Sequence, residues 1–503
     1  MIKLSKELPV KILLCSKQKL TGKYGQRFKD IDESLKALKE SDLKRNIKTS
    51  IVYLDDKSSE NITGIAPISS ITSRACKQYI DKLYKNLNPA YLCLIGAQDN
   101  IPFYEFENPL FDPDGDNDQL IYSDLPYACE KSHSTQMTDF VGPSRVVGRL
   151  PDIPFVNDYQ YFLKVIRNSK NFKSVDRKKL NAYFALSVKL WKNSSTESIT
   201  NIFNNSNKLL LSPPVNEKHS KTLLKPLLHF YNCHGALFTP EFYGQTGQSY
   251  PVCQHSSTLI DKISRGSVVS AECCYGAQMY DHKQLGQPDK SIANTYLGEG
   301  ACAFMGSTTI AYGPADGQGL ADLICQYFLI KIREGASLGR AFLEARQKFV
   351  KDSAEFDPYE LKTLHQFILL GDPSLVPFDL PKAKSSQESI EGRRNKMTII
   401  GKALQNSTAV FKIIAQKTSQ YNKTAVNHIL KELKFDKIKL KKSFAISPAK
   451  NSIATGKSAS ASTDSVLRVY YKATSKLNIK KISALVVREN KQRVLSYKIY
   501  ESK

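Results

Sequence analysis

Short apolar runs alternate with stretches of helical length from about residue 9 to residue 378 of this chain. This alternation limits the fold more than any other feature, because it is typical of a mostly parallel sheet with helices on both faces. The runs that we read as strands are residues 10–14, 49–54, 90–95, 182–187, 227–233, 267–273 and 301–306. The helices expected between them are residues 30–41, 73–86, 157–169, 256–263, 319–334 and 337–352. We therefore predict an α/β protein with a three-layer α/β/α core.

Breaks in this pattern divide the chain into four parts. Two prolines, Pro151 and Pro154, end a strand and begin a connection, so the core is split into an N-terminal α/β subdomain, residues 1–170, and a second α/β subdomain, residues 171–380. Beyond Pro377 the apolar periodicity stops. Residues 381–465 are predicted to be a basic linker with a Ser/Ala/Lys low-complexity segment at 447–465. Residues 466–503 are predicted to be a small β-rich or mixed module containing a hairpin.

The positive charge of the chain is concentrated in its last quarter. The net charge is +24, and residues 381–503 carry 27 Lys and Arg against 7 Asp and Glu, which leaves only +4 for residues 1–380. Such a tail is suited to an anionic partner, either nucleic acid or a membrane surface. The alternative is solvated charge on a poorly structured segment.

Membrane and secretory signals are missing from the sequence, and the cysteines are not arranged like those of a disulfide-rich domain. No run of about 18 apolar residues occurs, and residues 1–15 lack a long apolar stretch with a cleavage site. The ten cysteines are widely spread, several of them inside apolar runs, and form no CxxC pairs of the kind that bind zinc. We therefore expect reduced thiols, no transmembrane segment and a cytoplasmic location.

Two apolar strands each end at a reactive residue that is closely followed by glycine. The first is residues 227–235, which ends in Cys-His234-Gly235, and the second is residues 266–276, which contains Cys273 and Cys274 before Gly276. Neighbouring parallel strands end at the same edge of a sheet, where ligand crevices form. The sequence therefore predicts a thiol and an imidazole in one cleft.

These residue types fit nucleophilic catalysis. A cysteine attacks as thiolate, and a histidine can take its proton and later give one to the departing amine. The N–H of Gly235, unobstructed by a side chain, and the N–H of Cys273 can together hold an oxyanion. Alone, a histidine at a strand end is more often a structural residue bonded to the backbone.

The ordered set of motifs resembles the gingipain family of the caspase-like clan of cysteine peptidases. Besides His-Gly and Cys-x-x-Gly, the matching stretches are residues 90–103, 122–124, 146–151, 300–309 and 367–375. The resemblance covers roughly residues 85–378 and implies a caspase-like fold and a polypeptide substrate. It also implies that His234 is the catalytic histidine, Gly235 the oxyanion glycine and Cys273 the nucleophile.

The chain departs from the family pattern at several positions. Glu272 stands where a small residue is usual, and Cys274 would be the nucleophile if the spacing were Cys-x-Gly. Lys189 stands where an orienting carboxylate is expected, so the third catalytic residue is left open. The family implies an acidic residue that selects arginine or lysine at P1, the residue before the cleaved bond, and Glu197 is the nearest candidate. Trp191 is suited to line that pocket, although a packed core residue is the alternative.

One acidic loop is a candidate for metal binding. Asp112, Asp114, Asp116 and Asp118 alternate around Gly115, an arrangement in which calcium loops collect oxygen ligands, although it lacks the EF-hand glutamate. A solvated acidic turn is the alternative. We expect no required cofactor, and structural Ca²⁺ is the one metal that the residues suggest.

The leading hypothesis is a cysteine endopeptidase that cleaves through a thioester, after arginine or lysine as the family implies. One rival is a catalytically inactive peptidase fold used as a scaffold, which Lys189 and Glu272 favour. The other is a nucleic-acid or membrane-surface binding protein that acts through its basic tail.

Overall fold

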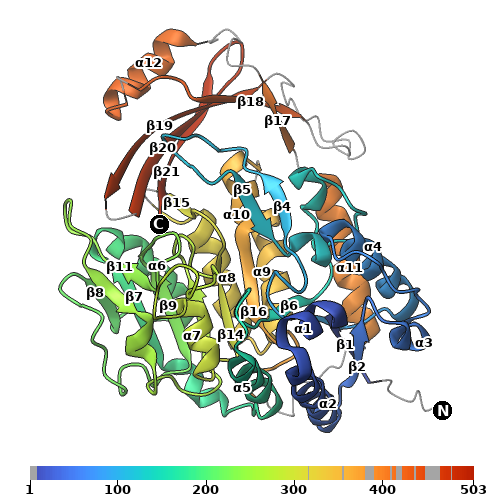
Figure 1. The fold of residues 1–503 in the computed structure, drawn as a ribbon. Coiled ribbons are helices and arrows are strands. Elements are labelled where there is room, and N and C mark those ends of the chain that lie inside the picture. The colour runs from blue at the N-terminus through green and yellow to red at the C-terminus, as the bar shows by residue number, and fades with distance from the viewer. Residues whose placement is uncertain are drawn as a thin grey trace, which may run out of the picture.

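A computed structural model describes residues 8–314, 317–353, 356–379, 390–407, 410–414, 422–435, 438–447, 465–476 and 479–503. The predicted low-complexity segment at 447–465 lies, apart from its two end residues, outside the described residues. Ten strands form the central sheet, in the order β2-β1-β3-β6-β16-β14-β13-β9-β7-β8 (Figure 1). The strands of the N-terminal half are β1 (Val10–Cys15), β2 (Lys48–Tyr53), β3 (Tyr91–Ile95) and β6 (Val147–Leu150). Those of the second half are β7 (Tyr183–Val188), β8 (Leu209–Ser212), β9 (Leu228–Asn232), β13 (Val268–Ala271), β14 (Ala303–Ser307) and β16 (Phe367–Gly371).

The sheet is mostly parallel, as predicted. Every neighbouring pair of strands runs parallel except β14 and β16, which are antiparallel; the two halves join where β16 pairs with β6. Strands β9 and β13, which precede the candidate histidine and cysteine, are neighbours. The topology therefore gives these two residues a common edge of the sheet.

Apolar side chains cover both faces of the sheet, because successive residues of a strand point to opposite sides. In β1, Ile12 and Leu14 pack in one hydrophobic cluster, and Leu13 and Cys15 pack in another. The helices on the first face are α4 (Ser73–Leu87), α6 (Lys192–Phe203), α8 (Leu320–Arg333), α9 (Leu338–Asp352) and α10 (Pro358–Gln366). Those on the second face are α1 (Lys17–Tyr24), α2 (Phe28–Lys44), α5 (Tyr159–Lys170) and α7 (Ile292–Gly298). The predicted three-layer α/β/α core is confirmed.

The expected helix at residues 256–263 forms only a short 3-10 turn, Ser256–Leu259. A further short helix is α3 (Glu60–Thr63). Two small antiparallel sheets lie beside the core: β4 (Tyr104–Glu107) with β5 (Leu120–Ser123), and β10 (His234–Gly235) with β11 (Glu241–Tyr243) and β12 (Val252–His255). None of the described helices combines the length and the apolar character needed to cross a bilayer.

Buried ion pairs account for several of the motif residues. Arg149 on β6 is fully buried and binds Asp124 through two hydrogen bonds of 2.9 and 2.6 Å. Lys11 on β1 is bonded to Asp372, and lies 2.8 Å from Asp42. Buried charges of this kind are tolerated only when they are paired. These residues therefore hold strand ends in place.

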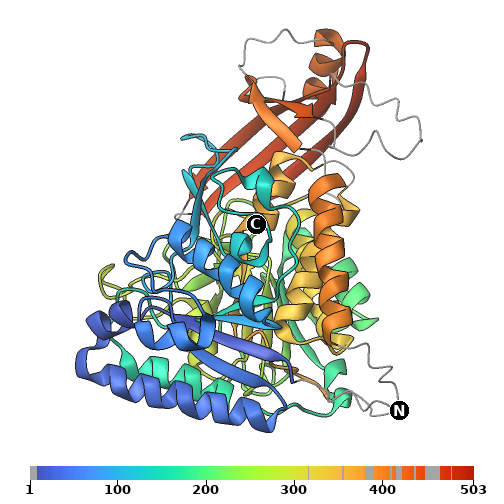
Figure 2. The same ribbon diagram turned by 90° about the vertical axis from the view of Figure 1, so that its right-hand side faces the viewer.

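The C-terminal module is larger than predicted. Its antiparallel sheet, in the order β15-β21-β20-β19-β18-β17, contains strands from the expected linker as well as from residues 466–503. Its strands are β15 (Tyr312–Pro314), β17 (Val410–Ile414), β18 (Lys442–Ser447), β19 (Val466–Lys476), β20 (Ile479–Glu489) and β21 (Val494–Ser502). Helix α11 (Ile390–Ser407) packs beside α9, and α12 (Lys423–Glu432) packs on the sheet (Figure 2).

The C-terminal sheet is joined to the core through β15, which follows β14 and pairs with β21. The end of the chain consequently lies beside β15, at the carboxyl edge of the second half of the central sheet (Figure 1).

Candidate active site

The ends of β9 and β13 bring the predicted catalytic residues together. Tyr231 on β9 is in register with Ala271 on β13, and the N–H of Glu272 donates to the carbonyl of Tyr231 at 2.8 Å. Gly235 passes directly against the chain after β13, because a Cβ atom at this position would lie 1.8 Å from the carbonyl oxygen of Cys274. Only glycine permits this approach, which sets the His234–Gly235 segment against the Cys273–Cys274 peptide.

The imidazole of His234 is held in one tautomer by Gln245. Nε2 of His234 lies 2.8 Å from Oε1 of Gln245, whose own Nε2 donates to the carbonyl of Gly247 at 3.0 Å. This second bond sets the orientation of the Gln245 amide, so its oxygen faces the histidine. Nε2 of His234 therefore carries the proton. Nδ1 holds a lone pair and has no hydrogen-bond partner among the described residues.

His234 is neutral in this structure. Its pKa is lowered to about 3, mainly by burial. The hydrogen bond to Gln245 raises the pKa, and the charges of Lys481 and Lys503 lower it. The ring of Trp191 meets the imidazole edge-on at 4.5 Å, and the ring of Tyr250 does so at 5.2 Å. Because Nδ1 is unprotonated and has no hydrogen-bond partner among the described residues, it is the nitrogen that can accept a thiol proton.

The two candidate thiols point into different surroundings. Cys273 is fully buried in the same hydrophobic cluster as Cys233 and Trp191. The pKa of the neighbouring Cys233 thiol is raised, first by burial and then by its interactions with Cys253 and Cys273. The thiol of Cys274 lies in the opposite cluster and donates to the carbonyl of Ala311 at 3.5 Å. Burial also raises the pKa of Cys274.

Two buried carboxyl groups lie next to this site. As a carboxylate, Glu272 would have no donor for either oxygen in the described part of the chain. Burial, followed by the charge of Asp322, raises the pKa of Glu272 well above its usual range. Burial beside a second acidic group disfavours the charged form, so Glu272 is the neutral member of the pair. Asp322 also accepts the hydroxyl of Ser194 at 2.7 Å.

A lysine occupies the space between these groups. Nζ of Lys503 lies 3.2 Å from Oδ1 of Asp322 and 4.5 Å from the centre of the Trp191 ring. The main-chain oxygen of Lys503 accepts the N–H of Cys274 at 3.3 Å, and its own N–H donates to Ala311 at 2.9 Å. The residue is 1% exposed. The side chain of Lys503 thus pairs with Asp322, while the main chain of Lys503 lies beside Cys274.

Comparison with known proteins places the chain in a family. A family model described as Peptidase family C25 matches residues 9–378. The chain belongs to peptidase family C25. The predicted resemblance to the gingipain family is confirmed, and with it a cysteine peptidase that acts on polypeptides.

A solved structure described as "Structure of Protease" is also similar to this C25 peptidase. Its TM-score is 0.48 and its sequence identity 13%, over 98% of this chain and 96% of the other. A search of curated proteins found no match.

Two other residues considered for the C25 site, Glu197 and Lys189, are exposed at the surface. Glu197 is exposed on α6, whereas Ser194 on the same helix contacts Asp322. Lys189 is exposed and begins the short 3-10 turn that ends at Trp191. Sequence reasoning missed Gln245, Asp322 and Lys503. Asp322 stands in the first turn of a predicted helix, but nothing in its spacing from Cys273 indicates that they meet.

The acidic loop of this C25 peptidase is neutralised by lysines. Lys362 lies 2.5 Å from Asp116 and 3.3 Å from Asp118, while Lys441 lies 3.9 Å from Asp112 and 3.8 Å from Asp114. Among the described residues no cluster of three or more side chains is arranged for a metal ion. As placed, the four carboxylates do not fit calcium, because ammonium groups take the positions of a cation. A calcium requirement stays a prediction.

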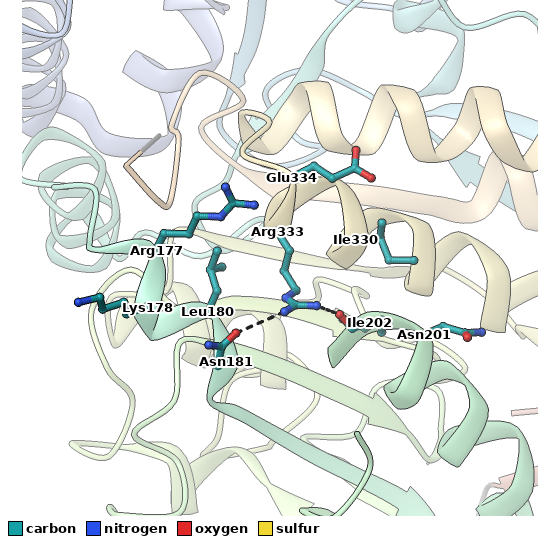
Figure 3. A pocket seen from close by; sticks show the side chains of 9 residues that line it. All are labelled: Arg177, Lys178, Leu180, Asn181, Asn201, Ile202, Ile330, Arg333 and Glu334. Carbon is teal, nitrogen blue, oxygen red and sulfur yellow. Dashed lines mark hydrogen bonds between the residues drawn. The ribbon is translucent and has the colours of Figure 1, made fainter. Parts of the chain in front are cut away.

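The pocket in Figure 3 lies away from the predicted catalytic residues of the C25 peptidase. It is a cavity of about 490 Å³ lined by basic and polar side chains, among them Arg177, Lys178 and Arg333. Residues 177–181 come before β7, so this pocket lies at the amino end of that strand, opposite the edge that carries His234. Arg333 points across it and bonds to Asn181 and to the carbonyl of Ile202. We assign it no role.

The remaining expectations concern location and partners. All ten cysteines of the C25 peptidase are free and buried. Those basic residues of the tail that the structure describes lie in the C-terminal module, where several, such as Lys472 and Lys476, are exposed. A cytoplasmic location and an anionic partner both stay predictions.

Proposed function

We propose that this C25 peptidase cleaves peptide bonds on the carboxyl side of lysine or arginine, with Cys273 as nucleophile and His234 as general base and acid. One observation carries the proposal: a lysine side chain lies on the buried Asp322 while its main-chain oxygen accepts the N–H of Cys274. A substrate lysine bound in the same way has its carbonyl group at the cysteines.

The first step forms the thioester. Nδ1 of His234 accepts the proton of the Cys273 thiol, and the sulfur attacks the carbonyl carbon of the scissile bond. The carbonyl oxygen becomes an oxyanion. Its proposed donors are the N–H of Gly235 and the N–H of Cys274, in place of that of Cys273, because the Cys274 N–H already donates to the main-chain oxygen of the lysine on Asp322. When the C–N bond breaks, the amine leaves with the proton that His234 accepted.

The second step returns the enzyme to its starting state. His234 takes a proton from a water molecule, the hydroxide attacks the thioester carbon, and the carboxylic acid product leaves as the thiol is reprotonated. Gln245 keeps Nε2 of His234 protonated in both steps, since its oxygen can only accept. Gln245 is thus proposed as the residue that orients the imidazole.

The preference for a basic residue rests on three side chains. Asp322 supplies a charge for the ammonium or guanidinium group, Glu272 supplies a neutral carboxyl beside it, and Trp191 covers the cation with its ring. A neutral side chain in this pocket leaves the buried Asp322 without a cation, which is costly.

Peptide cleavage with matched variants tests the proposal. Internally quenched peptides with lysine, arginine or glutamine before the reporter bond are incubated with the chain, Cys273→Ala and Cys274→Ala, each also in a Lys503→Ala background. We expect cleavage after lysine and arginine only, and its loss in Cys273→Ala alone. Cleavage that survives Cys273→Ala and is lost in Cys274→Ala contradicts the nucleophile assignment. A folded chain that cleaves no peptide in either background is a scaffold.

A further inference from the structure

The last strand of the chain binds the core in the manner of a peptide substrate. Strand β21 pairs antiparallel with β15, in the register Tyr312 with Ser502, Gly313 with Glu501 and Pro314 with Tyr500. Adding an extended segment to an exposed sheet edge is a common mode of peptide recognition, in which main-chain bonds give affinity and pockets give specificity. Strand β15 follows β14, which is the neighbour of β13, the strand that precedes Cys273.

Lys503 continues this pairing into the catalytic site. Its N–H donates to Ala311, its main-chain oxygen accepts from Cys274, and its ammonium group contacts Asp322. These are the contacts proposed above for the P1 residue. By the same alignment, Ser502, Glu501 and Tyr500 stand in the positions of the three residues that precede P1.

Residues before Lys503 secure the strand further. The hydroxyl of Tyr500 donates to Asp357 at 2.7 Å, and the hydroxyl of Ser502 donates to the carbonyl of Lys480 at 2.8 Å. Ile479, at the start of β20, is 2% exposed and packs with Ala236 and Tyr243 in the loops next to His234. The C-terminal module thus covers the site as well as filling it.

A substrate has no access to the catalytic residues in this arrangement. Cys273 and His234 are 0% exposed, and Lys503 is 1% exposed. Because Lys503 already neutralises Asp322, a second basic side chain cannot enter the pocket. The segment that fills the pocket is tethered, so its effective concentration is on the order of millimolar.

We propose that β21 and Lys503 form an intramolecular inhibitor, which binds as a substrate does and keeps the site closed until β21 separates from β15. This proposal rests on the proposed function, since it assigns Lys503 to the P1 position. Opening requires the loss of the short β15–β21 pairing and of the contacts that Tyr500 and Lys503 make with the core. The longer β20–β21 pairing, from Ser483 with Glu501 to Glu489 with Val494, can keep the C-terminal sheet folded.

The first test compares Lys503→Ala with the native chain. Cleavage of a small lysine reporter is measured, together with the rate at which iodoacetamide labels Cys273, located by mass spectrometry. The matched control is Lys476→Ala, which removes an exposed lysine at the end of β19 in the same sheet. We expect both rates to rise at least about tenfold in Lys503→Ala and to stay unchanged in the control. A chain that lacks Lys503 altogether should behave as Lys503→Ala does.

The second test adds the missing segment back. The octapeptide of residues 496–503 should inhibit Lys503→Ala competitively, and the same peptide ending in alanine should inhibit far less. Cleavage at equal rates in the native chain and Lys503→Ala overturns the inhibitor and leaves the peptidase intact. Faster labelling of Cys273 without any cleavage supports the occupied site and overturns the peptidase. Slow labelling and no cleavage in every folded variant overturn both.

Discussion

Oε1 of Gln245 lies 2.8 Å from Nε2 of His234, in a loop that follows the histidine by only eleven residues. A carboxylate at this position would stabilise the imidazolium, whereas an amide orients the ring without adding charge. The neutral imidazole, whose pKa burial lowers to about 3, fits this partner. Gln245 is therefore a positioning residue rather than a catalytic acid.

Replacing Gln245 tests this role. Gln245→Ala should lower kcat about 10- to 100-fold with little change in KM, because the imidazole loses its orienting bond but keeps its base. Gln245→Glu should move the acid limb of the kcat/KM profile to higher pH, since a carboxylate raises the pKa of His234. Profiles are measured on the native chain or on Lys503→Ala, whichever turns over faster.

The control for this prediction is Gln136→Ala, which truncates an exposed glutamine far from the site. An acid limb that stays in place in Gln245→Glu would show that this side chain does not face the titrating histidine during turnover.

The acidic residue of the specificity pocket is a second point for mutation. Asp322→Asn keeps the shape of Asp322 but removes the charge that lies 3.2 Å from a lysine ammonium. A hydrogen bond to a buried charge is worth about 2–3 kcal/mol, so kcat/KM for lysine reporters should fall about 30- to 150-fold. The kcat/KM for the glutamine reporter should change little, so the ratio of lysine to glutamine cleavage should fall.

Glu197 is the competing candidate for the acidic residue of the specificity pocket, because sequence reasoning selected it for that role. Its side chain is exposed on α6, so Glu197→Gln should leave the lysine preference intact. A loss of preference in Glu197→Gln, with none in Asp322→Asn, would support the assignment made from sequence.

Local patterns were sufficient to predict the core. Alternating apolar runs predict β9 and β13, and the helical pattern at residues 337–352 predicts α9, which begins at Leu338. His234 and Cys273 could be expected together because neighbouring parallel strands end at one edge. Each of these inferences needs only a short window of sequence and a general rule.

Long-range contacts were beyond such reasoning. Asp322 and Lys503 are separated by 181 residues, and their meeting depends on how β21 pairs with β15. The tail was expected to be a linker with a small module because its charge and low complexity hide the strands β17 and β18. Charge density reports solvation, whereas strand pairing depends on partners far away in the chain.

Three buried histidines make folding dependent on pH. Burial lowers the pKa of His229 to about 4, and of His234 and His365 to about 3, whereas an unfolded histidine titrates near 6.5. Below pH 6.5 the unfolded chain thus binds protons that the folded chain does not, and stability falls as the pH falls. The loss approaches about 1.4 kcal/mol per pH unit for each histidine until the folded pKa is reached.

The measurement is the urea midpoint of unfolding at pH 7 and pH 5. His365→Gln should be less stable at pH 7, because it loses the bond of 3.0 Å to Met137, but its midpoint should fall less steeply between the two pH values. Parallel pH profiles for the native chain and this variant would show that His365 is protonated in the folded state.

Lys362 is expected to supply the acidic loop with the positive charge that a metal ion supplies in calcium-binding loops. Its ammonium group lies 2.5 Å from Asp116 and 3.3 Å from Asp118, and its side chain is fully buried. Asp118 also accepts the hydroxyl of Tyr275, at 2.7 Å, and so ties the loop to the residue after Cys274. Lys362→Met should cost about 3–5 kcal/mol of stability, because it leaves the buried carboxylate of Asp116 and the half-buried one of Asp118 without their cation.

The effect of calcium on the melting temperature distinguishes a loop neutralised by lysines from a metal site. With the ammonium group gone, oxygens of the loop are free for a hard cation, so calcium should raise the melting temperature of Lys362→Met. The native chain should show no such rise, because Lys362 already supplies the positive charge. Magnesium, which demands a stricter octahedral geometry, serves as the matched control ion. A calcium-dependent rise in the native chain would mean that the loop exchanges its lysines for the metal, as the spacing of the aspartates predicts.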